Sequence, residues 1–504
     1  MLAEVLRKAG QEFGERPAYI SADGWPVTYQ QLDQFSDEAA VWLSRHGVGV
    51  GTVVALVLPS TVDYIVLYGA LAKVGAITAG VNPMLTGRER AAALECAAAD
   101  LVIADPALVD GVPPDARLIE HVAGDHPDAI AAAVRARGEA PPVLLDDPER
   151  GVAICFTSGS TGMPKGALFR EKQIRAIAWL DTGGGAGAGW GGGGHAVAST
   201  QFAHVGGMCK FSWLLAGGGT THLQHRWRAS TVLAWVQEYR MPALNVVAPQ
   251  LAIMLRLPDF DSYDLSSVKA IVAGAAPSTP GLIREARERI GAPYSVRWSS
   301  TESGGVGTAT ALDGDDEETM YTVGKPRMGV EAMVGDEAGR PLPAGEIGEL
   351  MIRSAGVMSE YWRNPEETAR TLTGGWLRTG DLALVDDRGF FRLAGRLKEM
   401  FIRGGYNVYP LEVEKILSAH PKVADIALVP RPDDVMGEIG VAVVVPRRAD
   451  DPPTLDDLRS FGASELAKYK LPERIRIVDD MPLNSGHKLD RRTLAARERE
   501  PANW

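Results

Sequence analysis

Short apolar runs alternate with longer, more polar segments along most of the chain. The runs have the length of buried strands, and the segments between them, such as residues 28–50, have the length and the spaced apolar residues of helices. The runs are VVALVLP (53–59), LVIADP (101–106), GVAICF (151–156), HAVAST (195–200), ALNVVAP (243–249) and VKAIVAG (268–274). Strands that are apolar along their whole length are typical of parallel sheets covered by helices. The pattern predicts an α/β fold with two packed, mostly parallel sheets.

The pattern changes after about Tyr321. Residues 331–354 contain short apolar runs broken by Gly and Pro, which predicts a small β-barrel or β-layer. Beyond residues 395–410, a helical segment and further apolar runs predict a compact α+β unit of about a hundred residues. We therefore expect a large N-terminal domain (residues 1–397) and a small C-terminal domain (residues 398–504).

Composition and charge narrow the function classes. The chain has 504 residues, too many for one compact core, and its 45% apolar and 23% charged residues are ordinary for a globular enzyme. The formal net charge of -12 disfavours nucleic-acid binding through the overall field of the protein. An anionic substrate must then be bound by local basic groups.

The cysteines and the N-terminus indicate the compartment. Cys96, Cys155 and Cys209 form no Cys-x-x-Cys pair and lie in apolar or small-residue contexts, as buried, reduced thiols do. The first residues predict an amphipathic helix, not a signal peptide, and no run is long and apolar enough to cross a membrane. We expect a cytoplasmic protein.

The segment TSGSTGMPKG (Thr157–Gly166) follows the apolar run 151–156 and has the composition of a phosphate-binding loop. Small residues leave backbone N–H groups and hydroxyls free to face phosphate oxygens, and Lys165 adds a positive charge. The Gly-Lys-Ser/Thr ending of a Walker loop is missing. A glycine-rich surface linker is the alternative, but the anchoring strand and the Pro-Lys-Gly ending favour phosphate binding.

This loop resembles the signature loop of the acyl-adenylate-forming superfamily, which includes acyl-CoA synthetases, amino-acid adenylation domains and luciferases. Other motifs follow in the order of that family. They are Gln201-Phe202-Ala203-His204, Gly274-Ala275-Ala276-Pro277, Trp298-Ser299-Ser300-Thr301-Glu302, Trp376-Leu377-Arg378-Thr379-Gly380-Asp381, Gly395-Arg396-Leu397-Lys398, Gly404-Gly405-Tyr406-Asn407 and Gly486-His487-Lys488. The resemblance implies that a carboxylate attacks the α-phosphate of ATP to give acyl-AMP, and that a thiol, usually of coenzyme A, then displaces AMP.

The resemblance also implies roles for single residues. Glu302 would hold Mg²⁺, Asp381 would accept both ribose hydroxyls, and Lys488 would contact the carboxylate and the α-phosphate. Catalytic roles fall on Lys488, Thr301, Glu302 and His204, although a core histidine is the alternative for His204. The ATP or AMP site would comprise Thr157, Ser158, Gly159, Ser160, Thr161, Gly162, Lys165, Gly274, Ala275, Ala276, Trp298, Ser299, Asp381 and Arg396. The acyl pocket would comprise His204, Val205, Gly206, Val247, Trp298 and Gly304.

In this family the small domain rotates between the two half-reactions. Lys398 occupies the hinge position, and Gly404, Gly405 and Tyr406 would line the tunnel for the thiol arm. A tight turn is the plainer interpretation of the two glycines.

Two residues depart from the family pattern. Ser299 stands where a glycine is usual, and His487 lengthens the usual Gly-Lys motif by one residue. Either change could weaken adenylation, which leaves a protein competent mainly in the thioester step as a hypothesis.

The segments expected to line the acyl pocket are apolar or small. Val205 stands where amino-acid-activating relatives have an aspartate, and only Lys210 could hold a second carboxylate. We expect a hydrophobic monocarboxylic acid, aliphatic or alicyclic and of bulky shape. The glycine-rich residues 183–195 are either a surface loop or room for such a ligand. The alternatives are an acyl-AMP ligase that loads a carrier-protein pantetheine, and a catalytically silent binding protein; the chain is expected to be a monomer or a homodimer.

Overall fold

The computed structural model describes residues 2–157, 163–183, 190–404, 406–483 and 489–499. Its largest sheet has seven strands in the order β18-β8-β7-β4-β3-β5-β6. The strands are β3 (Val53–Val57), β4 (Ile77–Gly80), β5 (Leu101–Ala104), β6 (Leu118–Glu120), β7 (Gly151–Thr157), β8 (Lys165–Arg170) and β18 (Glu360–Tyr361). β3 to β7 are parallel, and β8 and β18 are antiparallel to their neighbours. The predicted α/β fold is confirmed.

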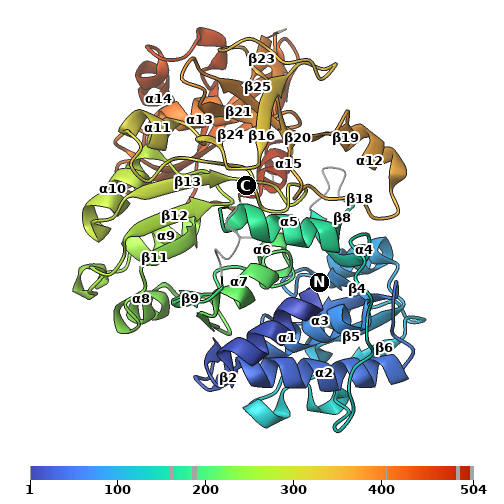
Figure 1. The fold of residues 1–504 in the computed structure, drawn as a ribbon. Coiled ribbons are helices and arrows are strands. Elements are labelled where there is room, and N and C mark those ends of the chain that lie inside the picture. The colour runs from blue at the N-terminus through green and yellow to red at the C-terminus, as the bar shows by residue number, and fades with distance from the viewer. Residues whose placement is uncertain (1, 158–162, 184–189, 405, 484–488, 500–504) are drawn as a thin grey trace.

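The two faces of this sheet pack into different hydrophobic clusters. Along β3, Val54 and Leu56 join the main core, whereas Val53, Ala55 and Val57 join a smaller cluster with residues of α4. Alternate side chains of a strand point to opposite faces, so an entirely apolar strand needs cover on both. The covering helices are α1 (Leu2–Phe13), α2 (Tyr29–Arg45), α3 (Val62–Val74), α4 (Gly87–Ala97) and α5 (Glu171–Asp181). α3 is buried along its whole length, and α1 and α2 pack against it (Figure 1).

Two more sheets complete the region before residue 330. They have the orders β2-β1-β10-β9 and β11-β12-β13-β14-β15. Their strands are β1 (Pro17–Ile20), β2 (Pro26–Thr28), β9 (His195–Val197), β10 (Thr220–His222), β11 (Ala243–Val247), β12 (Ala270–Gly274), β13 (Tyr294–Trp298), β14 (Thr308–Ala309) and β15 (Lys325–Pro326). The helices here are α6 (Val205–Met208), α7 (Phe211–Gly217), α8 (Ala229–Glu238), α9 (Ala248–Leu255), α10 (Pro280–Ile290) and α11 (Asp316–Tyr321).

The predicted small β-barrel corresponds to an antiparallel sheet of five strands, in which β17 and β20 are central. The strands are β16 (Glu331–Gly335), β17 (Gly348–Arg353), β19 (Leu372–Thr373), β20 (Trp376–Val385) and β21 (Phe391–Arg396), and α12 (Pro365–Thr371) precedes β19. β20 and β21 carry two of the predicted nucleotide-binding residues.

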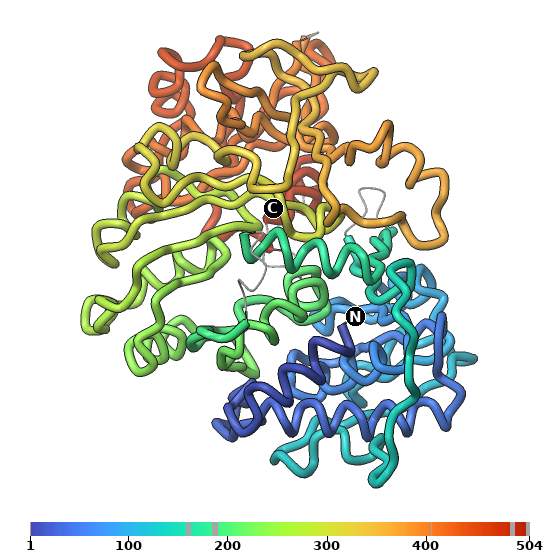
Figure 2. The backbone as a smooth tube through the Cα atoms, in the orientation of Figure 1, coloured from blue at the N-terminus to red at the C-terminus, as the bar shows by residue number. Residues whose placement is uncertain are grey.

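The last part of the chain has its own sheet and its own hydrophobic clusters. Figure 2 shows it, in orange and red, at the opposite end of the molecule from the blue N-terminal residues. Its elements are β22 (Phe401–Arg403), β23 (Tyr406–Val408), α13 (Pro410–Leu417), β24 (Val423–Asp433), β25 (Gly437–Pro446), α14 (Leu455–Gly462), β26 (Arg474–Ile477) and α15 (Arg491–Arg499). α13 packs against β21 of the preceding part of the chain, and Lys415 Nζ of α13 donates to the backbone oxygen of Tyr321 at 2.8 Å.

Among the described helices, none has both the length and the apolar composition needed to span a bilayer.

A buried histidine, His222, contacts the half-buried His195 where β9 and β10 run side by side. His195 Nδ1 lies 2.8 Å from His222 Nε2, and the ring of Tyr239 packs against both imidazoles. His222 is fully buried, and this burial, together with the nearby His195, lowers the pKa of His222 to about 4. The unfolded chain, with a histidine pKa of about 6.5, therefore binds a proton that the folded chain excludes between these two pH values.

We expect His222 to make the protein less stable as the pH falls below 6.5. The contribution of His222 to the free energy of unfolding is complete above the histidine pKa of the unfolded chain. It decreases by about 2 kcal/mol from pH 6.5 to pH 5. Thermal unfolding at pH 7.5 and pH 5 should therefore show a smaller drop in Tm for His222→Phe than for the unchanged protein. His126→Gln, at a largely exposed histidine, is the control and should leave the drop unchanged. Equal drops for His222→Phe and the unchanged protein would contradict this assignment.

Candidate active site

The predicted phosphate loop joins two strands of a hairpin. β7 and β8 are antiparallel, and Thr157 pairs with Lys165. Both residues are partly buried at the end of the seven-stranded sheet. The predicted phosphate contacts of Ser158, Gly159, Ser160, Thr161 and Gly162 lie outside the described residues. The hairpin therefore fixes both ends of the loop.

Lys165 contacts an acidic residue that the sequence did not indicate. Its ammonium group forms an ion pair with Glu367 of α12 and lies 5.1 Å from the ring centre of Tyr361. The hydrogen bond from Lys165 is the largest of the effects that hold the pKa of Glu367 below its usual range, and the charge of Lys398 acts in the same direction. The loop lysine, α12 and the predicted hinge residue are thus electrostatically linked.

Tyr361 also contacts Glu302. Its hydroxyl donates to Glu302 Oε1 at 2.8 Å, and the backbone N–H of Met358 donates to the Glu302 carbonyl at 2.8 Å. Burial, followed by the charge of Glu302, raises the pKa of Tyr361 well above its usual value. Tyr361 therefore lies between the loop lysine and the carboxylate predicted to bind Mg²⁺.

The segment that carries Glu302 is a compact turn after β13. Ser300 and Ser303 exchange hydrogen bonds, and the N–H of Gly304 donates to the Thr301 carbonyl at 3.0 Å. The turn leaves Ser299 exposed and Thr301 half-buried. Gly304 was predicted to line the acyl pocket, but it is buried with a φ of +72°, and a Cβ there would approach the carbonyl of Gly356 to 2.4 Å. The turn itself requires that glycine.

A second group of predicted residues meets at Asp381. The indole Nε1 of Trp298 donates to Asp381 Oδ2 at 2.8 Å, and Arg396 Nε donates to Oδ1 at 3.0 Å. Asp381 of β20 and Arg396 of β21 are direct partners in the antiparallel sheet. The side chain of Asp381 is 13% exposed, so its carboxylate can still reach a ligand.

The predicted adenine-contacting turn follows β12, beside β13. Gly274 pairs with Arg297, the residue before Trp298, so the turn begins next to the indole. Ala275 has a φ of +62°, in the left-handed region that most residues avoid. Ala275 is exposed, and Gly274 and Ala276 are half-buried.

The predicted acyl-pocket residues around α6 are partly exposed. His204 precedes this helix, and its Nε2 lies 3.2 Å from Asn82 Nδ2. Val205, Gly206 and Val247 are half-buried, so each offers some apolar surface. No described contact tests the catalytic role of His204.

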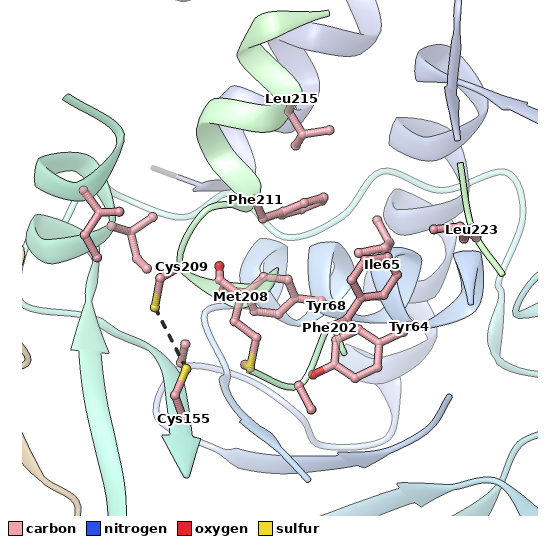
Figure 3. Close-up of a cluster of buried hydrophobic side chains, with 14 of the residues drawn as sticks. Tyr64, Ile65, Tyr68, Cys155, Phe202, Met208, Cys209, Phe211, Leu215 and Leu223 are labelled. Carbon is pink, nitrogen blue, oxygen red and sulfur yellow. Dashed lines mark hydrogen bonds between the residues drawn. The ribbon is translucent and has the colours of Figure 1, made fainter. Parts of the chain in front are cut away.

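Buried side chains bring the β7–β8 hairpin, which carries the predicted phosphate loop, into contact with the segment that follows α6. Cys155 of β7 and Cys209, just after α6, are buried with their sulfur atoms 3.9 Å apart. Figure 3 shows this pair beside Met208, Tyr68 and Phe211. The expectation of buried thiols holds for these two residues, whereas Cys96 is half-buried.

Lys210 does not present a free charge. Its ammonium group donates to Asp181 Oδ2 at 2.8 Å and to the Gly305 carbonyl at 3.1 Å. Asp181 also accepts from Arg327 at 2.8 Å. Burial alone would raise the pKa of Asp181, but Lys210 and Arg327 outweigh it, so the net shift is downward. Lys210 is thus a structural cation.

We expect Asp181→Ala to destabilise the protein by about 3–5 kcal/mol, because it leaves two largely buried cations without their shared carboxylate. The Asp181 side chain is only 4% exposed. Denaturant titration measures the change. Asp264→Ala is the matched control: it breaks an exposed pair with Arg240 and should cost less than about 1 kcal/mol. Similar losses in both variants would contradict this account.

The predicted hinge and tunnel residues lie at the start of the predicted C-terminal domain (residues 398–504). Lys398 is exposed in the turn after β21. The N–H of Gly404 donates to the Met436 carbonyl, and Tyr406 stacks on Tyr469 with ring centres 4.7 Å apart. Gly405, Gly486, His487 and Lys488 lie outside the described residues, so the structure does not place the predicted catalytic lysine.

Comparison with known proteins gives the family. The family model described as AMP-binding enzyme matches residues 6–362, and the model for the AMP-binding enzyme C-terminal domain matches residues 412–488. The chain is 30% identical to the indoleacetate–CoA ligase of Aromatoleum aromaticum, over 98% of each chain. It is 29% identical to the medium/long-chain-fatty-acid–CoA ligase FadD8 of Mycobacterium tuberculosis, over 90% of this chain and 82% of that one.

A solved structure agrees along the whole length. ATP-bound MatB from Rhodopseudomonas palustris superposes with a TM-score of 0.87 at 26% identity, over 99% of this chain and 100% of that one. The chain therefore belongs to the AMP-binding enzyme family, within the adenylate-forming superfamily, and to the AMP-forming acid–thiol ligases of that superfamily.

Proposed function

We propose that this protein is an ATP-dependent acyl-CoA ligase for a hydrophobic, bulky monocarboxylic acid, aliphatic or alicyclic. One observation carries the proposal. Trp298 and Arg396 meet at the Asp381 carboxylate, and Lys165 and Glu302 meet at Tyr361. These contacts between residues far apart in the chain support a ribose acceptor at Asp381 and a phosphate site at Lys165 and Glu302.

In the first half-reaction, the acid attacks the α-phosphate of ATP and pyrophosphate leaves. Asp381 would accept the ribose hydroxyls, Lys165 and the loop hydroxyls would hold the outer phosphates, and Lys488 would offset charge that develops at the α-phosphate. Thr301 would also contact the α-phosphate. Lys165 must then exchange its contact with Glu367 for phosphate oxygen when ATP binds.

Glu302 fits a magnesium ion bound mainly by nucleotide and water. Among the described residues, no three or more His, Cys, Asp or Glu side chains gather to form a protein-only metal site. Mg²⁺ commonly takes one or two carboxylates with phosphates and waters. When bound, the ion would neutralise phosphate charge, and Tyr361 would orient the Glu302 carboxylate toward it.

In the second half-reaction, a thiol attacks the acyl carbonyl of acyl-AMP and AMP leaves. We propose that the domain of residues 398–504 turns about Lys398 and that Gly404, Gly405 and Tyr406 then line the path of the pantetheine arm of coenzyme A. The separate sheet and hydrophobic clusters of this domain support its movement as one body.

The environment of Lys210 supports a monocarboxylic acid. Its charge is already balanced by Asp181, which also accepts from Arg327, so it would not pair with a second carboxylate of the substrate. Val205, Gly206 and Val247 provide apolar or small surface. The fatty-acid and indoleacetate ligases among the relatives act on acids with large apolar parts, as their names state.

The test is a panel of carboxylic acids with ATP, Mg²⁺ and coenzyme A, in which acyl-AMP and acyl-CoA are followed separately by mass. A bulky hydrophobic acid should give both products. Malonate or a free amino acid as the best substrate would overturn the substrate assignment. Transfer only to a phosphopantetheinyl carrier protein would favour a carrier-loading ligase. Thioester formation from supplied acyl-AMP, without pyrophosphate release from any acid, would favour a protein limited to the second step.

A further inference from the structure

Trp298 connects the end of β13 to the carboxylate of Asp381. The indole Nε1 donates to Asp381 Oδ2 at 2.8 Å, and Trp298 is only 7% exposed. The sequence motifs assigned Trp298 to the nucleotide site and to the acyl pocket, and the structure adds a hydrogen bond to Asp381. A buried donor on a charged acceptor is among the stronger hydrogen bonds in proteins.

The two donors on Asp381 differ in rigidity. Arg396 is long and 62% exposed, so water competes for its guanidinium and for the carboxylate. Trp298 is held by the sheet, where it pairs with Thr308, and its ring packs against the backbone of Gly307 so tightly that a Cβ there would lie 2.9 Å from the indole Cε3. The indole is therefore the more rigid of the two donors, and it sets the orientation of the Asp381 carboxylate.

Counting acceptor sites shows what this contact leaves available. A carboxylate offers about four lone-pair sites, two on each oxygen. Trp298 uses one on Oδ2 and Arg396 uses one on Oδ1. Within the part of the chain that the structure describes, these are the donors to the carboxylate, so one site remains on each oxygen, which matches the two neighbouring hydroxyls of a ribose.

We propose that Trp298 is a positioning residue that orients Asp381 to accept both ribose hydroxyls of ATP. The inference rests on the proposed function, in which Asp381 binds the ribose. If Trp298 served only as a packing wall, a phenylalanine would replace it with little change in ribose recognition. If the indole N–H orients the carboxylate, its loss lets Asp381 turn, and recognition of both hydroxyls weakens.

The experiment compares Trp298→Phe with the unchanged protein in ATP–pyrophosphate exchange, using ATP, 2′-deoxy-ATP and 3′-deoxy-ATP. We expect the KM for ATP to rise about tenfold, with kcat changed less than about threefold. The ratio of kcat/KM for ATP to kcat/KM for either deoxy-ATP should be at least about fivefold smaller in Trp298→Phe than in the unchanged protein. The reason is that the Asp381 carboxylate is no longer aligned with the ribose hydroxyls. Trp42→Phe, at an indole of α2 that stacks on His46 just after that helix, is the control and should change neither quantity.

A second variant keeps the shape of the ring. Benzothienylalanine at position 298 replaces the N–H by sulfur, and it should reproduce the same changes even where phenylalanine disturbs folding. The role of Trp298 alone would be overturned by one pair of results. The analogue would keep the KM for ATP and the loss of kcat/KM on removal of a hydroxyl, whereas Asp381→Asn would raise the KM and reduce that loss. If Asp381→Asn also leaves both unchanged, the ribose role of Asp381 fails and the inference fails with it.

Discussion

Replacing Lys488 by alanine is expected to slow acyl-AMP formation at least about a hundredfold, because a single preorganised group that stabilises developing charge contributes about this much. Conversion of supplied acyl-AMP to acyl-CoA should stay within about twofold, since that step forms no new charge at the α-phosphate. The neighbours on either side are described: Leu483 and Leu489 form an antiparallel bridge, and the N–H of Asp490 donates to the Pro482 carbonyl at 2.8 Å.

Two assays separate the half-reactions for Lys488→Ala. Pyrophosphate release reports the first, and acyl-CoA formation from synthetic acyl-AMP reports the second. Lys422→Ala is the matched control in the same domain, since Lys422 forms a partly exposed ion pair with Asp451 and should affect neither assay. Retention of both half-reactions by Lys488→Ala would show that this lysine is not the adenylation lysine.

Three strands of the large sheet, β3, β5 and β7, could be predicted because each is a continuous run of apolar residues. β3 sends alternate side chains into two cores, so every residue must be apolar, and such a run is visible without knowledge of its partners. The antiparallel return of β8 was not predicted. Its direction is set by its pairing with β7 and β18, and β18 lies far along the chain.

The candidate site shows the same limit. Motif order predicted Glu302, Asp381 and Arg396. In the structure Arg396 donates to Asp381, and Glu302 accepts from the hydroxyl of Tyr361. Glu367 and Tyr361 were missed, because no local pattern marks them. Their contacts depend on β18 pairing with β8, which brings α12 to Lys165 across 202 positions. The hydrogen bond of Trp298 to Asp381 likewise joins two separate sheets.

Replacing Glu302 by glutamine is expected to lower kcat for adenylation about a hundredfold and to raise the Mg²⁺ concentration for half-maximal rate at least about tenfold. Glutamine keeps the size of the side chain, and its amide oxygen can still accept from Tyr361, but it lacks the negative charge that a hard cation prefers. The measurement is pyrophosphate release as a function of Mg²⁺ at saturating ATP.

Two variants separate the charge of Glu302 from its surroundings. Tyr361→Phe removes the hydroxyl that donates to Glu302 but keeps the carboxylate, so we expect a loss of less than about tenfold. Glu360→Gln removes a neighbouring carboxylate that pairs with Arg170 at the partly exposed edge of the sheet, and it should leave the Mg²⁺ dependence unchanged. Because only Glu302→Gln removes the charge predicted to face the phosphates, a normal Mg²⁺ dependence in that variant would show that the ion is held without this residue.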